Sequence, residues 1–135
     1  MNAAALPDLA FEAGLLGFAL GLFHYGLAVK ALNKIIRSKS PLWRMPLAGA
    51  LVFVGVAALH AWGRFGLSPR IAELESRIQE AAAGLRMAEM EVLQARLEEV
   101  LGLLGNIRDL SFAGILLGSL TALAAGLSFL RATSK

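Results

Sequence analysis

Two histidines are the side chains of this sequence best suited to hold a cofactor. His24 and His60 both lie in long apolar stretches, and histidines on neighbouring membrane helices can ligate a haem iron. Each histidine lies past the middle of its stretch, but the two stretches run in opposite directions. At 1.5 Å per residue, their depths in a membrane differ by about 13 Å. This offset is too large for one haem within a chain, so we predict no cofactor; haem ligation across copies is the alternative.

The carboxylates do not form a catalytic or metal-binding pattern. Glu12 is the one acidic residue inside an apolar stretch, and it lies a single turn from the end, where water reaches it. The other glutamates fall in a charged segment without metal-ligand spacing, and Glu73 and Arg77 have the i, i+4 spacing of a surface ion pair. The chain contains no Cys, which excludes thiol catalysis. We therefore expect neither an enzyme nor a metal site, and no nucleic-acid motif is present.

Three apolar stretches dominate the rest of the chain. Hydrophobic residues make up 57% of it, against about 45–50% in soluble proteins. About 20 apolar residues cross a hydrocarbon core of about 30 Å, and each stretch has that length. We therefore predict an all-α integral membrane protein, a single membrane domain over residues 1–135, with transmembrane helices at 9–30, 45–64 and 110–130.

Basic residues indicate which side of the membrane each segment occupies. The connector between the first two stretches carries five basic residues that we expect to face lipid headgroups: Lys30, Lys34, Arg37, Lys39 and Arg44. The tail after the third stretch, on the same side, adds Arg131 and Lys135. Lys and Arg accumulate on the cytoplasmic side of membranes. We therefore predict a plasma (inner) membrane protein with its C-terminus in the cytoplasm and its N-terminus outside.

The segment 68–105 lies between the second and third stretches and is rich in Ala, Leu, Glu and Arg, which favour helix. Both of its ends must return to one membrane surface, so a single upright helix is excluded. Apolar stripes with coiled-coil spacing change register close to Gly84, which favours a fold-back at 81–84 into an extracytoplasmic helical hairpin. A helix lying flat on the headgroups is the alternative.

The boundaries and the apolar face of this hairpin follow from the same pattern. We expect Gly66, Ser68 and Pro69 to break the chain between the second span and the hairpin. The residues predicted to form the hairpin interface are Ile71, Leu74, Ile78, Leu85, Leu93, Leu97, Val100 and Leu104.

Small residues recur at helical spacing along the first and third stretches. Motifs of the form small-x-x-x-small let helix backbones approach closely in a membrane. The residues predicted to pack against other helices in this way are Gly14, Gly17, Gly21, Gly114, Gly118 and Ala122.

A hairpin of two short helices cannot bury its own apolar stripes, so the remaining surface is expected to contact other proteins. We predict a non-catalytic accessory or scaffold subunit of an inner-membrane complex, or a homo-oligomer, that docks through the hairpin and the glycine-rich faces. Its expected partners are membrane lipids and either other membrane subunits or copies of itself, not nucleic acid. The alternatives are a homo-oligomeric channel or holin-like pore, a haem-binding membrane anchor, and an insertase-like protein.

Overall fold

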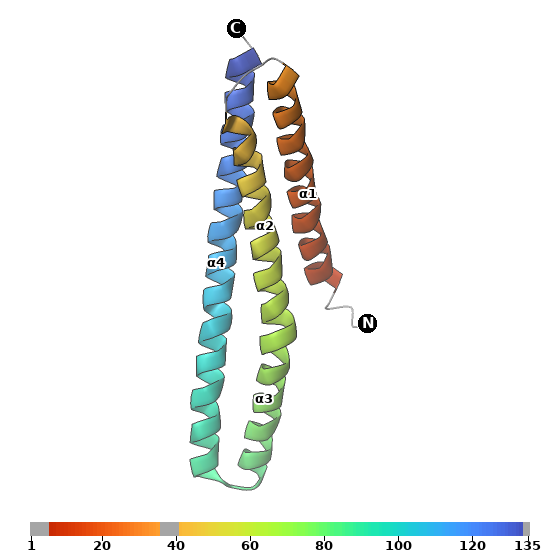
Figure 1. The fold of residues 1–135 in the computed structure, drawn as a ribbon. Helices are drawn as coiled ribbons and strands as arrows, with labels where there is room; N and C mark the ends of the chain where they lie inside the picture. Colours follow the sequence, from red (N-terminus) through yellow and green to blue (C-terminus); the bar gives the residue numbers. More distant parts are fainter. Residues whose placement is uncertain (1–5, 36–40, 134–135) are drawn as a thin grey trace. The chain divides into compact units, whose positions relative to one another are not determined.

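The structure, a computed structural model, describes residues 6–35 and 41–133 and is built from helices joined by short turns (Figure 1). The α-helices are α1 (Leu6–Ile35), α2 (Arg44–Trp62), α3 (Ser68–Ala83) and α4 (Met87–Thr133). A 3₁₀ helix, Pro41–Trp43, leads into α2, and a π-helical segment, Gly63–Leu67, joins α2 to α3. The described residues contain no strand.

Three helical stretches of the described chain are long and apolar enough to cross a membrane: Asp8–Ile35, Pro41–Ala83 and Met87–Arg131. Large apolar side chains lie exposed along them, and Leu51, for example, is 74% exposed. In water such a surface would drive association, whereas lipid covers it at no cost. The prediction of an all-α integral membrane protein with three transmembrane helices is therefore confirmed.

The chain divides into two compact units. The first unit comprises Met1–Ala58 and Phe112–Lys135, and it contains α1, most of α2 and the C-terminal part of α4. The second unit, Leu59–Ser111, contains the end of α2, the π-helical segment, α3 and the N-terminal part of α4.

A small apolar core holds the first unit together. Its buried residues come from α1 and α2 and are Leu15, Ala19, Ala50, Phe53, Val56 and Ala57. The rings of Phe18 and Phe53 meet edge to face with centroids 5.0 Å apart. The C-terminal part of α4 joins this core through Ile115, and Phe129 of α4 lies with its ring centroid 6.3 Å from that of Tyr25 in α1. All three helices of the unit are therefore in contact with one another.

In the second unit, α3 and the N-terminal part of α4 form an antiparallel helical hairpin (Figure 1). The N–H of Leu85 donates to Ala82 O at 3.1 Å and the N–H of Arg86 donates to Ala81 O at 2.9 Å, which is the Schellman pattern of a helix C-terminus. The left-handed residue of this turn is Leu85, with φ 54°, and not Gly84, whose φ is −85°. The predicted hairpin is thus confirmed, and the alternative of one continuous helix lying flat on the headgroups is wrong.

The expected break between the second span and the hairpin is absent. The chain stays helical through Gly66, Ser68 and Pro69, because the π-helical segment widens the preceding turn. The N–H of Ser68 donates to Gly63 O, five residues earlier. Pro69 has no N–H to give and lies in the first turn of α3, where a proline costs little. π-helical turns occur mostly as single-turn bulges inside α-helices, so the π-helical segment before Pro69 does not end the helix.

The helix α4 likewise continues without a break. It runs for 47 residues from Met87 to Thr133, so it includes both the second arm of the hairpin and the third span. The polar residues Asn106, Arg108 and Asp109, which separate the two regions in the sequence, remain within the helix. The two regions therefore differ in polarity but not in secondary structure.

Candidate functional site

Gly114 and Gly118 of α4 pack against α2 in the first unit. A Cβ added at Gly114 would collide with Val56 Cγ2, and a Cβ at Gly118 would lie 2.6 Å from Phe53 Cε2. Ala122, one turn further along, is half-buried. These positions occupy the contact between two helices of the same chain, as expected for a small-x-x-x-small motif.

The glycines of α1 lie on a different kind of surface. Gly14, Gly17 and Gly21 are exposed, and a Cβ added at any of them would meet nothing within 4 Å. The helix α1 instead packs within the unit through a second stripe, whose buried or half-buried members are Leu15, Ala19, Leu22, Gly26 and Val29. At 100° per residue the two stripes lie about 130° apart around the helix. We call Gly14, Gly17 and Gly21 the open glycine face.

An apolar groove lies at the edge of the open glycine face. It has a volume of about 330 Å³. The residues that line it are Phe11, Gly14, Leu15, Phe18, Phe53 and Ser119. Because α1, α2 and α4 all contribute to the lining, the groove is a feature of the assembled unit and not of α1 alone. Aromatic rings beside an exposed glycine backbone form a surface that an apolar helix or an acyl chain can fill.

Two of the tightest contacts in the first unit involve glycines that sequence reasoning missed. A Cβ at Gly49 of α2 would lie 2.8 Å from Thr121 Oγ1 of α4 and 3.3 Å from Leu22 Cδ1 of α1. A Cβ at Gly26 of α1 would lie 2.9 Å from Leu47 Cδ2. At Gly49, side chains of both α1 and α4 therefore approach the backbone of α2. The sequence does contain a pattern that indicates packing at Gly26: residues 15, 19, 22, 26 and 29 repeat with the alternating spacings of four and three that are typical of a helix contact face.

Most of the residues predicted for the hairpin interface are buried or half-buried. Leu93 is buried, and the half-buried residues are Ile71, Leu74, Ile78, Leu97, Val100 and Leu104. Leu85 is the exception, because it is 83% exposed. The apolar stripe of α3 ends at Ala81, which is fully buried, and the chain then turns. Leu85 therefore belongs to the turn between α3 and α4.

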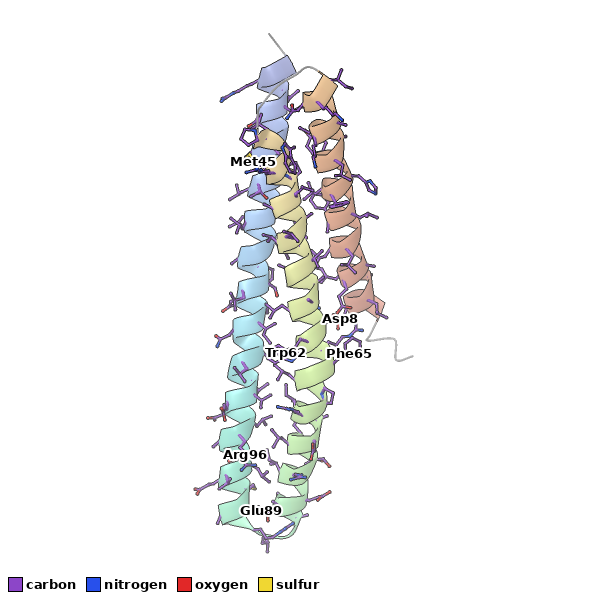
Figure 2. The ribbon with its side chains drawn as sticks, viewed as in Figure 1. Asp8, Met45, Trp62, Phe65, Glu89 and Arg96 are labelled. Carbon is purple, nitrogen blue, oxygen red and sulfur yellow. The ribbon has the colours of Figure 1, made fainter. Side chains whose placement is uncertain are left out.

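One face of the hairpin carries a groove of about 430 Å³ with a mixed polar and apolar lining. The residues that line it are Arg70, Glu73, Leu74, Arg77, Arg96, Glu99, Val100 and Leu103. Arg77 Nη2 lies 2.8 Å from Glu73 Oε1, and both side chains are largely exposed. Near the turn, Arg86 Nη1 and Glu89 Oε2 form a second pair at 2.8 Å; Figure 2 labels Glu89 there and Arg96 further along α4. Exposed pairs of this kind contribute little stability.

Of the predicted lipid-facing basic residues, Lys30, Lys34 and Arg44 are exposed, while Arg37 and Lys39 lie outside the described residues. Lys30 and Arg44 both contact the ring of Trp43, which is half-buried where α2 begins. A tryptophan and cations at the end of an apolar helix are typical of the membrane–water interface.

The histidines and Glu12 differ in exposure and in the helix that carries them. His24 is exposed on α1, with its ring edge to face with Phe23 at 6.1 Å between centroids. His60, near the end of α2, and Glu12, in the second turn of α1, are half-buried. Among the residues that the structure describes, no group of three or more His, Asp or Glu side chains is close enough to hold a metal ion.

Comparison with known proteins finds no matching family model, no matching curated protein and no matching solved structure.

Proposed function

We propose that this chain is a non-catalytic accessory or scaffold subunit of a membrane protein complex, or the repeating unit of an assembly of its own copies. In this proposal it docks through the open glycine face within the membrane and through the hairpin outside it. The N-terminus and hairpin lie outside the plasma membrane and the C-terminus lies in the cytoplasm, as the distribution of Lys and Arg favours.

The observation that carries the proposal is the difference between the two glycine stripes. Gly114 and Gly118 are covered by α2, whereas Gly14, Gly17 and Gly21 have nothing within 4 Å of a Cβ position. Glycine at the lipid surface of a helix gains no packing energy and lowers helix propensity. A row of three such residues is accounted for if a helix of another chain packs there, since close backbone approach is what these motifs provide.

The surface area of the spans supports the same interpretation. Only 17% of the apolar window of the third span is buried within the chain, and the core of the first unit consists of six buried residues. A core of this size supplies limited stability on its own. Contacts with further helices would add buried area, and in a membrane such contacts rely on van der Waals packing more than on the hydrophobic effect.

The hairpin adds a second docking surface. Its arms bury one stripe against each other, but Val92 is 56% exposed and Leu103 is 45% exposed. Charged residues of both signs surround these apolar positions, which is the composition of a polar rim around a contact. A partner protein with a complementary helical surface would cover them.

The proposal is tested by the size of the particle extracted from native membranes in a mild detergent. We expect the wild-type chain to elute as an assembly heavier than 14.3 kDa after correction for detergent, and Gly17→Leu to release the single chain. The matched control is Gly126→Leu, because a Cβ at Gly126 also has open space but lies on α4, away from the open glycine face. A monomeric wild-type protein would contradict the proposal.

A further inference from the structure

One end of the first unit is positively charged and has no acidic side chain nearby in the sequence. No Asp or Glu occurs between Glu12 and Glu73, and none follows Asp109. The acidic residues of the first unit are therefore Asp8 and Glu12, both within the first two turns of α1. Lys30 lies near the other end of the same helix. The cations at this end, Lys30, Lys34 and Arg44, therefore have no acidic side chain of their own unit near them in the sequence.

Two of these cations contact the same indole ring. Lys30 Nζ lies 4.8 Å from the centroid of Trp43, and Arg44 Cζ lies 5.5 Å from it. Both distances are within the range of about 6 Å over which cation–π attraction acts. Lys30 belongs to α1 and Arg44 begins α2, so the ring brings together charges from two helices. The two cations repel each other, and an anion between them would relieve that repulsion.

Gly26 explains why the two helices come close enough for this contact. A Cβ at Gly26 would lie 2.9 Å from Leu47 Cδ2 and 3.2 Å from Trp43 O, so the backbone of α1 lies directly against the start of α2. Lys30 follows Gly26 by four residues, on the same face of α1. The helix contact therefore places Lys30 within reach of the Trp43 ring.

We infer that Lys30, Trp43 and Arg44 form a binding site for the phosphate group of an anionic lipid. A lysine supplies a compact charge and an arginine supplies paired N–H donors, the two types of group that bind phosphate in proteins. The first turn of α2 adds the positive end of a helix dipole; Figure 2 labels Met45 in that turn, beside Arg44. The site lies where an apolar span begins, which is the depth of the headgroups, so the phosphate is that of a membrane lipid.

Fluorescence of Trp43 provides the test. The chain has two tryptophans, and Trp62→Phe leaves Trp43 as the single reporter. The full chain with this substitution is reconstituted in phosphatidylcholine vesicles, and brominated phosphatidylglycerol or brominated phosphatidylcholine is added as quencher. We expect the anionic quencher to act at several-fold lower mole fraction than the neutral one. Lys30→Gln and Arg44→Gln each remove one of the two charges that contact the ring, so each should reduce this preference several-fold.

Two controls separate a site from general attraction to a charged surface. Lys34→Gln removes a cation one turn from Lys30 that has no contact with Trp43, and it should leave the preference unchanged. Lys30→Arg keeps the charge and should retain the preference, which shows that the fold is intact. The inference is overturned if the two quenchers act equally, if Lys34→Gln lowers the preference as much as Lys30→Gln, or if millimolar inorganic phosphate abolishes it.

Discussion

Gly118 of α4 lies directly against the ring of Phe53 of α2. A Cβ at position 118 would come within 2.6 Å of Phe53 Cε2 and 2.9 Å of Phe53 Cζ. Phe53 is 3% exposed and its ring also meets that of Phe18 edge to face, so the ring has little room to move. This contact joins the third span to the core of the first unit.

Gly118→Ala should therefore destabilise the folded chain. The added methyl group would force the buried ring or the helix to shift, which costs about 1–3 kcal/mol. The measurement is the free energy of unfolding in mixed detergent micelles. Gly126→Ala is the matched control on the same helix, since a Cβ at Gly126 meets nothing within 4 Å. Equal stability of the two variants would mean that α4 does not pack on α2 as described.

The turn of the hairpin yields a prediction of opposite sign. Leu85 has φ 54°, and a left-handed conformation costs a residue with a Cβ about 1–2 kcal/mol. Leu85→Gly should remove this strain and slow amide hydrogen exchange in the last turn of α3. Because Leu85 is 83% exposed, little packing is lost with its side chain.

The neighbouring Gly84 provides the control for this prediction. Its φ of −85° is open to any residue, and a Cβ there would first meet the flexible end of Arg86, at 3.0 Å. Gly84→Ala should therefore change stability by less than about 0.5 kcal/mol. If Gly84→Ala proves the more damaging substitution, the turn conformation described here is wrong.

The orientation in the membrane can be tested by labelling, because the chain contains no Cys. Ala82→Cys introduces a thiol at an exposed position of α3, and Lys34→Cys does so at the end of α1. In spheroplasts, a membrane-impermeant maleimide should label the first variant directly and the second only after permeabilisation. The reverse pattern would place the hairpin in the cytoplasm.

The channel alternative predicts a different behaviour. A scaffold has no need of a water-filled path, and the described spans carry few polar side chains, of which Ser111 and Thr121 donate their hydroxyls to carbonyls of their own helix at 2.8 Å and 2.7 Å. We therefore expect liposomes that contain the purified chain to retain an encapsulated dye. Leakage that rises with protein density would favour a pore instead.

The transmembrane helices and the hairpin could be predicted from the sequence because length and hydropathy determine them locally. The exact turn could not. Gly84 is the C-cap of α3, as a glycine near a helix end suggests, but its conformation is not left-handed, and Ala81 is the fully buried residue of this turn. The register of the two arms therefore places Leu85, and not Gly84, at the left-handed position. Likewise, Pro69 favoured a break in the helix. From the sequence alone, a proline that ends a helix looks the same as a proline that follows a π-helical turn within a continuous helix.

The role of each glycine was also beyond prediction from the sequence. The stripes at Gly14–Gly21 and Gly114–Gly118 have the same small-residue character, yet only the second is covered within the chain. What separates them is a distant residue, Phe53, whose ring fills the space over Gly118. Such a pairing between residues far apart in the sequence depends on the tertiary arrangement, which local periodicity does not contain.

The measurement that tests the central claim most directly is photo-cross-linking from the open glycine face in native membranes. In the Cys-free chain, Gly17→Cys can carry a benzophenone, and Leu16→Cys provides the matched control at the same depth but about 100° around α1. We predict that the probe at position 17 yields a defined adduct heavier than the 14.3 kDa chain, whereas the probe at position 16 yields mainly lipid adducts of single chains. If position 17 gives no more protein adduct than position 16, α1 faces lipid there and the docking proposal is wrong.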